Sequence, residues 1–346
     1  RVAAQAAQLQ LHTLLGGTAS SALPVPADVP HCGRYNAEYD EIFAAIRLHV
    51  AFGIDEIDLA GGTALAQHAS DASSDVDMVV FYNQIRSLPR LIVEPYYVLY
   101  SNRLPERANP AQYLPKSASQ LRHMVGIRLE LRDGNWDLVH ETAYQFGRTA
   151  DGFGIDNQRN LRINAWASGT WLGHTWYAHP WKPRLAIGFD YASGDGDSNC
   201  VAPGGNLARS CGGNANTFEN FFPTNFLHVG YMLNGAWRNT IQPQVNIQAR
   251  PTGRDHIEIW ALRKYLASAR DNWYRGSQGP LIFSRSDNTT THVGDELDVA
   301  WSHMFADGKV SLAVVYGHFF SGPYIRHQLG TSADQDWGIV QLWTNF

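Results

Sequence analysis

The chain repeats one pattern along most of its length, namely segments of roughly ten residues in which apolar and polar side chains alternate. The stretch "RHMVGIRLEL" (122–131) shows the pattern well. Its odd positions are mostly apolar, whereas its even positions include Arg122, Arg128 and Glu130. A period of two is that of a β-strand whose two faces meet different surroundings. We count about fourteen such segments, each near the length that a tilted membrane-spanning strand needs.

Turn signals join these segments into hairpins. The turn "RDGN" (132–135) contains Asp-Gly, a strong hairpin signal. The strand that follows, "WDLVHETAYQFGR" (136–148), carries Trp136 on one face and Asp137 and Glu141 on the other. The same alternation in other segments assigns further charged residues to the polar face: Arg47, Arg162, Arg184, Asp190, Arg250, Glu258, Lys264, Glu296 and Asp298.

Two architectures satisfy this pattern. A water-soluble sandwich or propeller turns the apolar face inward, whereas an outer-membrane barrel turns it outward to lipid. No stretch approaches the roughly 20 apolar residues of a membrane helix, but hydropathy does not detect barrel strands, because their two faces average out. Tight turns such as "RPTGRD" and "ADGK" contrast with long connections at 101–118 and 193–223, and aromatic residues lie near strand ends. These features favour the barrel.

The end of the chain supports the same choice, because "DWGIVQLWTNF" alternates up to Phe346. We therefore predict one all-β domain over 1–346, a transmembrane antiparallel up-and-down β-barrel of roughly 14–18 strands with short periplasmic turns and long extracellular loops. Phe346 is the expected membrane-insertion signal, and residues 1–40 are expected to supply a first strand plus a loop. The expected location is the bacterial outer membrane, and the sequence shows no signal peptide at its start.

Several longer motifs resemble the alginate-export family of outer-membrane β-barrels. The likeness is dense from about residue 120 to 346 and weaker from 40 to 120, where "VDMVVFYNQ" is the best match. The resemblance implies a monomeric barrel whose lumen passes an anionic exopolysaccharide passively from periplasm to surface. The motifs are "YQFGR" (144–148), "RLAIGFDYASGD" (184–195), "FENFFPTNFLHVGY" (218–231), "DNWY" (271–274), "VGDELDVAWSHMF" (293–305) and "LAVVYGHFFSGPYI" (312–325).

The chemistry of such a substrate indicates which lumen residues matter. A polyuronate carries one carboxylate per sugar, and arginine pairs carboxylates through a planar fork that stays charged. Together with the resemblance, the polar faces predict an anion-selective lumen with weak, multiple sites. The same residues also fit cross-strand ion pairs that hold the wall of any large barrel together. The candidates are Arg47, Arg122, Arg128, Arg162, Arg184, Arg250 and Lys264, opposed by Asp137, Glu141, Asp190, Glu258, Glu296 and Asp298.

Other chemistry is weakly signalled. Cys200 and Cys211 flank a Gly- and Pro-rich loop and are candidates for a disulfide, although two free thiols fit the sequence equally well. Asp195 and Asp197 lie in a Gly-rich loop without a full calcium-loop pattern, so we expect no metal. No nucleophile elbow or phosphate loop is present, so we expect no enzyme and no cofactor. A net charge of −5 without a basic run argues against nucleic acid.

Three functions remain open at this stage. The first is export or diffusion of an alginate-like polysaccharide or oligosaccharide. The second is a general porin for small solutes, and the third is a plugged barrel that binds periplasmic or surface protein partners. Contact with outer-membrane lipid is common to all three. The first and third differ in whether the long connections or the segment 16–40 fill the lumen.

Overall fold

The computed structural model describes residues 42–52, 55–65, 76–102, 120–150, 160–196, 214–220, 229–232, 234–274, 280–285, 287–305 and 308–344. Its elements are β1 (Ile42–Phe52), β2 (Asp55–Leu65), β3 (Val76–Gln84), β4 (Leu91–Asn102), β5 (Gln120–Asp133), β6 (Trp136–Ala150), β7 (Asn160–Thr175), β8 (Arg184–Ala192), β9 (Asn214–Ala215), β10 (Thr240–Ala249), β11 (Asp255–Tyr265), β12 (Trp273–Tyr274), β13 (Pro280–Ile282), β14 (His292–Phe305), β15 (Val310–Ser321), α1 (Pro323–Leu329) and β16 (Gln335–Thr344).

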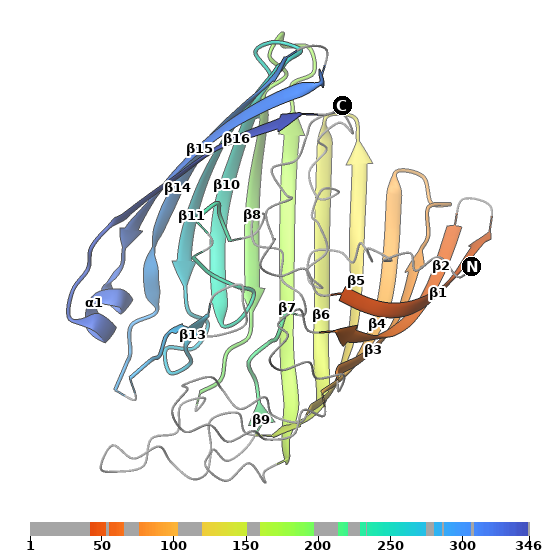
Figure 1. Ribbon diagram of the computed structural model, residues 1–346, viewed down its shortest axis with the longest axis vertical. Helices are drawn as coiled ribbons and strands as arrows, with labels where there is room; N and C mark the ends of the chain where they lie inside the picture. Colours follow the sequence, from red (N-terminus) through yellow and green to blue (C-terminus); the bar gives the residue numbers. More distant parts are fainter. Residues whose placement is uncertain are drawn as a thin grey trace.

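One 14-stranded sheet dominates the described residues, and it curves into a wall (Figure 1). Its main path runs β1-β2-β3-β4-β5-β6-β7-β8-β10-β11-β14-β15-β16, so strands that are neighbours along this path pair in chain order, and each pair is antiparallel. β9 pairs in parallel with the start of β7, and β12 and β13 form a separate two-stranded sheet. The predicted all-β, antiparallel, up-and-down fold is confirmed. Within the described ranges, no pairing joins β1 to β16.

The connections alternate in length, as in outer-membrane barrels. The short ones span 53–54, 85–90, 134–135, 176–183, 250–254 and 306–309. The long ones span 66–75, 103–119, 151–159, 193–239, 266–291 and 322–334. In Figure 1 the turn between β7 and β8 lies at the top and α1 at the lower left, beyond the lower ends of the strands on that side, so the two kinds occupy opposite ends of the wall. By the general rule, the long-connection end faces the cell exterior.

Within the described ranges, α1 is the one helix. Among the described residues, no helix is long and apolar enough to cross a membrane.

The wall exposes its apolar face and buries its polar one. Ile187 is 56% exposed and Val340 70%, whereas Arg128 is 1% exposed and Asp190 is fully buried. A water-soluble sheet does the reverse, because apolar surface left in water costs about 25 cal/mol per Å². The outward face is therefore suited to lipid, as the alternating strands predict. We call the opposite, polar face the interior face.

The described parts of the connection between β8 and β10 (193–239) pack on the interior face. Its Phe218 and Trp237 are buried in an apolar cluster with Ile163 and other inward side chains of β3 to β8. Tyr231 packs against a second cluster, and Met232 belongs to a third. Burying one large apolar side chain contributes about 1.5–3 kcal/mol. These anchors therefore hold the described parts of the connection firmly against the wall.

Candidate functional site

The charged residues buried in the wall gather on the interior face. They come from β4 to β14 because the two-residue period turns every second side chain inward. Four are cations and eight are carboxylates: Arg122, Arg128, Arg184 and Lys264, and Glu94, Glu130, Asp137, Glu141, Asp190, Glu258, Glu296 and Asp298. Buried charges are tolerated only when they are paired or hydrogen-bonded. The partners of each cation therefore decide what it can do.

Arg128 is held by carboxylates of the wall. Its Nη1 donates to Glu94 from β4, and its Nη2 donates to Glu130 of its own strand at 2.8 Å. Arg128 and Glu94 are each 1% exposed at the side chain. Glu94 also accepts a hydrogen bond from Gln84 of β3. This cluster links β3, β4 and β5, and the Arg128 charge is compensated within the wall.

Arg184 and Asp137 form a second compensated pair. Arg184 Nη2 lies 2.5 Å from Asp137 Oδ1, and Nε lies 3.1 Å from Oδ2, which is a two-pronged arrangement. The pair bridges β8 and β6 across β7, where Gly173 lies beneath it. A Cβ at Gly173 would lie 2.3 Å from Arg184 Nη2 and 2.7 Å from Asp137 Oδ1. The glycine therefore makes the room that this ion pair needs.

Arg122 is bound instead by the β8–β10 connection. Its Nη2 lies 3.0 Å from Glu219 Oε2, and its Nη1 donates to Gln145 Oε1 at 2.6 Å. Gln145 also clamps the Glu219 backbone, donating to its carbonyl at 2.6 Å and accepting from its N–H at 3.0 Å. The Arg122 side chain is buried, and Glu219 supplies its countercharge. One contact point of the connection is thus fixed on β5 and β6.

Lys264 on β11 anchors the connection at a second point. Its Nζ lies 2.7 Å from Glu296 Oε2 of β14, and it donates to the carbonyl oxygens of Val229 and, at 3.1 Å, Asn234. The neighbouring backbone meets carboxylates. The N–H of Tyr231 donates to Asp298 at 2.9 Å.

Two further bonds complete this anchor. The N–H of Met232 donates to Glu296 at 3.1 Å, and the Tyr231 hydroxyl donates to Glu258 at 2.9 Å. Gly230 has φ +84°, a left-handed conformation that glycine adopts readily. A Cβ there would lie 2.0 Å from Glu296 Oε1, so this close approach also requires glycine.

The inward side of β10 is a row of amides: Gln242, Gln244, Asn246 and Gln248. Gln244 donates to Asp190 at 2.5 Å, and Asn246 donates to Glu258 at 2.8 Å. Gln248 bridges Asn246 and Glu258 at 2.9 and 3.1 Å. On β6, Glu141 accepts from the Tyr96 hydroxyl at 2.8 Å. Neutral side chains thus donate hydrogen bonds to three of the buried carboxylates, Asp190, Glu258 and Glu141.

The structure corrects the placement of Arg162. Its side chain is exposed on the outward face with Trp166 and Leu172, whereas Ile163 points inward. The physical reason is that the interior here is not polar, because Phe218 and Trp237 pack on the inward side of β7. An apolar residue is therefore favoured inside.

The other predicted residues divide into placed and undescribed ones. Arg250 follows the end of β10, is half-buried, and donates its N–H to the Trp181 carbonyl at 2.8 Å. The side chain of Arg47 lies outside what the structure describes, and so do Asp197, Cys200, Cys211, Phe346 and residues 1–40. The remaining wall candidates, Arg122, Arg128, Arg184, Lys264, Asp137, Glu141, Asp190, Glu258, Glu296 and Asp298, are buried on the interior face.

Asp195 belongs to a polar network at the long-connection end. Its Oδ2 accepts from the Asn216 N–H at 2.8 Å, and its own N–H donates to Asp271 at 2.8 Å. Asp271 also accepts from the Thr217 hydroxyl at 2.6 Å and the Tyr274 hydroxyl at 2.7 Å. No group of three or more His, Cys, Asp or Glu side chains in the described part of the chain is arranged to hold a metal ion. The network ties the β8–β10 connection to the connection before β14.

Several interior partners were missed by the sequence reasoning. Glu94 was detectable, because "LIVEPYYV" alternates and places it on the polar face. Glu219 and Tyr231 carried no such signal, since their segment has no regular period. Arg238, which lies 4.3 Å from the centre of the Tyr274 ring in a cation–π contact, was also missed. Glu219, Tyr231 and Arg238 all come from the long connection between β8 and β10.

Comparisons with known proteins agree with the fold described above. The sequence matches the family described as "Alginate export" over residues 41–338. The crystal structure of Pseudomonas aeruginosa OccK11 (OpdR) is similar with a TM-score of 0.50 and 12% identity, covering 94% of this chain and 75% of that one. It shares the outer-membrane β-barrel fold. The crystal structure of the ferric enterobactin receptor PfeA in complex with BCV-L6 matches with a TM-score of 0.45 and 10% identity, covering 81% of this chain and 42% of that one. No curated protein sequence matches the chain.

Proposed function

The chain belongs to the alginate export family, and from this premise we propose that it is an outer-membrane channel through which an alginate-like anionic polysaccharide, or its oligosaccharides, passes by diffusion. The polar interior face and the lipid-suited outward face support a transmembrane passage. No reaction chemistry is part of the proposal.

One observation carries the proposal further. The four buried cations of the described wall divide by their partners. Arg128 and Arg184 pair with carboxylates of the wall itself, which do not leave. Arg122 and Lys264 are bonded in part to the β8–β10 connection, through Glu219 and through the carbonyls of Val229 and Asn234. Displacing the connection therefore uncovers two cations at separate points of the wall.

We infer that the described parts of the β8–β10 connection form a constriction, which opens when their anchors leave the wall. With the connection in place, polysaccharide carboxylates are excluded from Arg122 and Lys264. With it displaced, both cations meet the polymer, and Lys264 does so beside Glu296. A cation with a carboxylate neighbour binds a passing anion weakly, and weak, repeated binding is what conduction requires. Anion preference then belongs to the open state.

Single-channel current in a planar bilayer tests this proposal, with uronate oligomers added as the probe. Phe218→Ala/Trp237→Ala removes two buried apolar anchors of the connection and leaves every wall charge in place. Each such truncation costs about 3–5 kcal/mol, so the open fraction should rise by more than a hundredfold. Adding Arg122→Gln should then weaken the block by uronate. The exposed aromatic pair Trp181→Ala/Phe283→Ala is the matched control and should leave the current unchanged.

The other two functions give different outcomes. A wild type and an anchor variant that both remain non-conducting would contradict a channel and support a plugged scaffold. Current that rises in the anchor variant but is indifferent to uronate, with or without Arg122, would indicate a general porin for small solutes.

A further inference from the structure

Two arginines lie directly opposite each other on the outward face. Arg148 of β6 and Arg162 of β7 are register partners, and both side chains are exposed. Neither guanidinium has an ion pair or hydrogen bond with another residue in the described ranges. Like charges directly opposite in a sheet repel each other and destabilise the pairing. The outward face thus holds two adjacent positive charges, and an external anion bound between them would relieve their repulsion.

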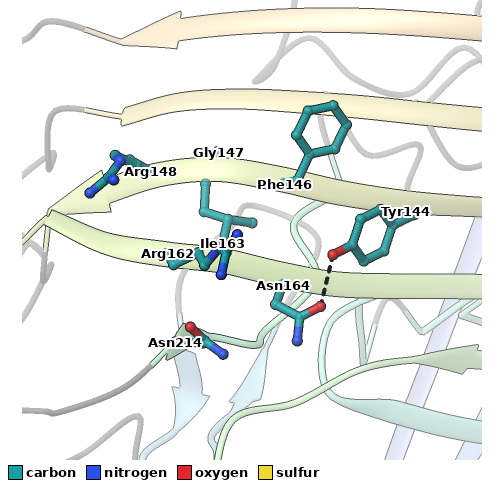
Figure 2. A pocket seen from close by; sticks show the side chains of 8 residues that line it. All are labelled: Tyr144, Phe146, Gly147, Arg148, Arg162, Ile163, Asn164 and Asn214. Atoms are coloured by element: carbon teal, nitrogen blue, oxygen red, sulfur yellow. Dashed lines mark hydrogen bonds between the residues drawn. The ribbon is translucent and has the colours of Figure 1, made fainter.

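The position of this pair is informative. β6 ends and β7 begins at the long connection 151–159, so the arginines lie at the end of the wall that faces the cell exterior. They border a hollow of about 760 Å³ that Asn214 of β9 also lines (Figure 2). Next along β6, the hollow is lined by Phe146 and Tyr144, whose hydroxyl donates to Asn164 at 2.9 Å.

The surroundings separate into a charged part and an apolar part. Beyond the arginines, toward the middle of the wall, the outward face carries Phe146, Tyr144 and Trp166, which are 37%, 43% and 47% exposed. Aromatic side chains in such a band mark the boundary between headgroups and hydrocarbon. The arginines therefore lie at the level of the lipid headgroups, and the aromatic band beside them lies at the level where the acyl chains begin.

We propose that Arg148 and Arg162 form a binding site for the phosphate groups of an outer-leaflet glycolipid. A guanidinium presents two parallel N–H donors that match phosphate oxygens, and two guanidinia on neighbouring strands can share a phosphate or hold a pair of phosphates. The aromatic side chains below accept the acyl chains of the same molecule. A soluble phosphate would use the arginines alone, so the continuity of charge with the apolar band points to the lipid.

Lipid retention tests the site directly. Protein in detergent is mixed with diphosphorylated lipid A or with its dephosphorylated form, and bound glycolipid is counted by native mass spectrometry. The wild type should retain the phosphorylated form preferentially. Arg148→Gln/Arg162→Gln should weaken that binding about thirtyfold, because each arginine near anionic lipid contributes roughly a fivefold preference. Arg148→Lys/Arg162→Lys keeps the charge without the fork and should lie between the two.

The control removes the same charge at the opposite end of the wall. Arg90→Gln/Arg254→Gln alters two exposed arginines in short connections and should bind lipid A like the wild type. Heat-shifted mobility on a gel verifies that each variant is folded. Equal retention of both glycolipid forms, or unchanged binding by Arg148→Gln/Arg162→Gln, would overturn the proposal. Displacement of lipid A by millimolar inorganic phosphate would also overturn it, because the ligand would then be the free anion.

Discussion

Replacing Arg128 by methionine tests how the buried ion pairs support the wall. Arg128 and Glu94 are each 1% exposed at the side chain, and Glu130 is the second carboxylate partner. Methionine fills much of the same volume without the charge. The change leaves two neighbouring carboxylates without their cation on the interior face. Breaking a buried pair by removing one partner costs about 3–5 kcal/mol, so we expect a loss of unfolding free energy in that range.

A matched ion pair elsewhere in the chain isolates the effect of burial. Arg90 and Asp133 are 2.6 Å apart, but their side chains are 66% and 58% exposed. An exposed pair contributes about 0–1 kcal/mol, so Arg90→Met should change stability little. Both variants can be unfolded with urea in lipid vesicles and followed by tryptophan fluorescence. The contrast between them should be at least about 2 kcal/mol.

A second substitution separates lost attraction from lost packing. Glu94→Gln in the Arg128→Met background removes one of the stranded carboxylates and should restore part of the lost stability, since the remaining cost comes from uncompensated charge. A loss below 1 kcal/mol for Arg128→Met, or no recovery with Glu94→Gln, would refute the assignment of a structural role. Altered ion selectivity at unchanged stability would instead identify Arg128 as a lumen cation.

Three further outcomes follow from local geometry. Gly173→Ala forces a Cβ to within 2.3 Å of Arg184 and should lower unfolding free energy in urea by about 1–3 kcal/mol, whereas Gly253→Ala, with nothing within 4 Å, should be nearly neutral. Burial raises the pKa of Tyr324 to about 12. The stability from its neutral phenol is therefore complete below pH 10 and is lost at about 1.4 kcal/mol per pH unit as pH rises toward 12. Tyr324→Phe should abolish this loss in alkaline unfolding titrations. Asp271→Asn replaces one carboxylate oxygen by a donor in a buried network and should cost about 1–3 kcal/mol locally, seen as faster proteolysis of the connections with the strands still protected.

The regular strands were predictable because their two faces meet uniform surroundings. A strict period of two placed Arg122 and Arg128 opposite the apolar positions of β5, and Asp137 and Glu141 opposite Trp136 on β6, without knowledge of any contact. The same alternation in "LIVEPYYV" also places Glu94 on the polar face, although Glu94 is not among the predicted residues. Partner choice was not predictable, since the sequence does not state which inward carboxylate lies within reach of which cation.

Arg162 shows where the periodic argument fails. The segment "NLRINAWASGTWL" alternates, but assigning its apolar positions to lipid assumed a polar interior along the whole strand. The β8–β10 connection makes the interior apolar beside Ile163, because Phe218 and Trp237 pack there. That connection has no period of its own, so its inward course and its contacts with the wall carry no signal in the alternation. The error therefore arises from a tertiary contact rather than from a misread strand.

The arginines of this chain differ in role because their neighbours differ. Arg128 is saturated by wall carboxylates, Arg122 shares its charge with a connection, and Arg148 has no described countercharge on the outward face. Counting arginines along a lumen therefore overstates its attraction for anions, and in the described wall carboxylates outnumber cations. An anionic polymer gains from such a wall only where a cation exchanges one partner for another. Among the four buried cations of the described wall, Arg122 and Lys264 alone have a partner outside the wall. Under the proposed function, opening and anion recognition would therefore be a single event at these two residues.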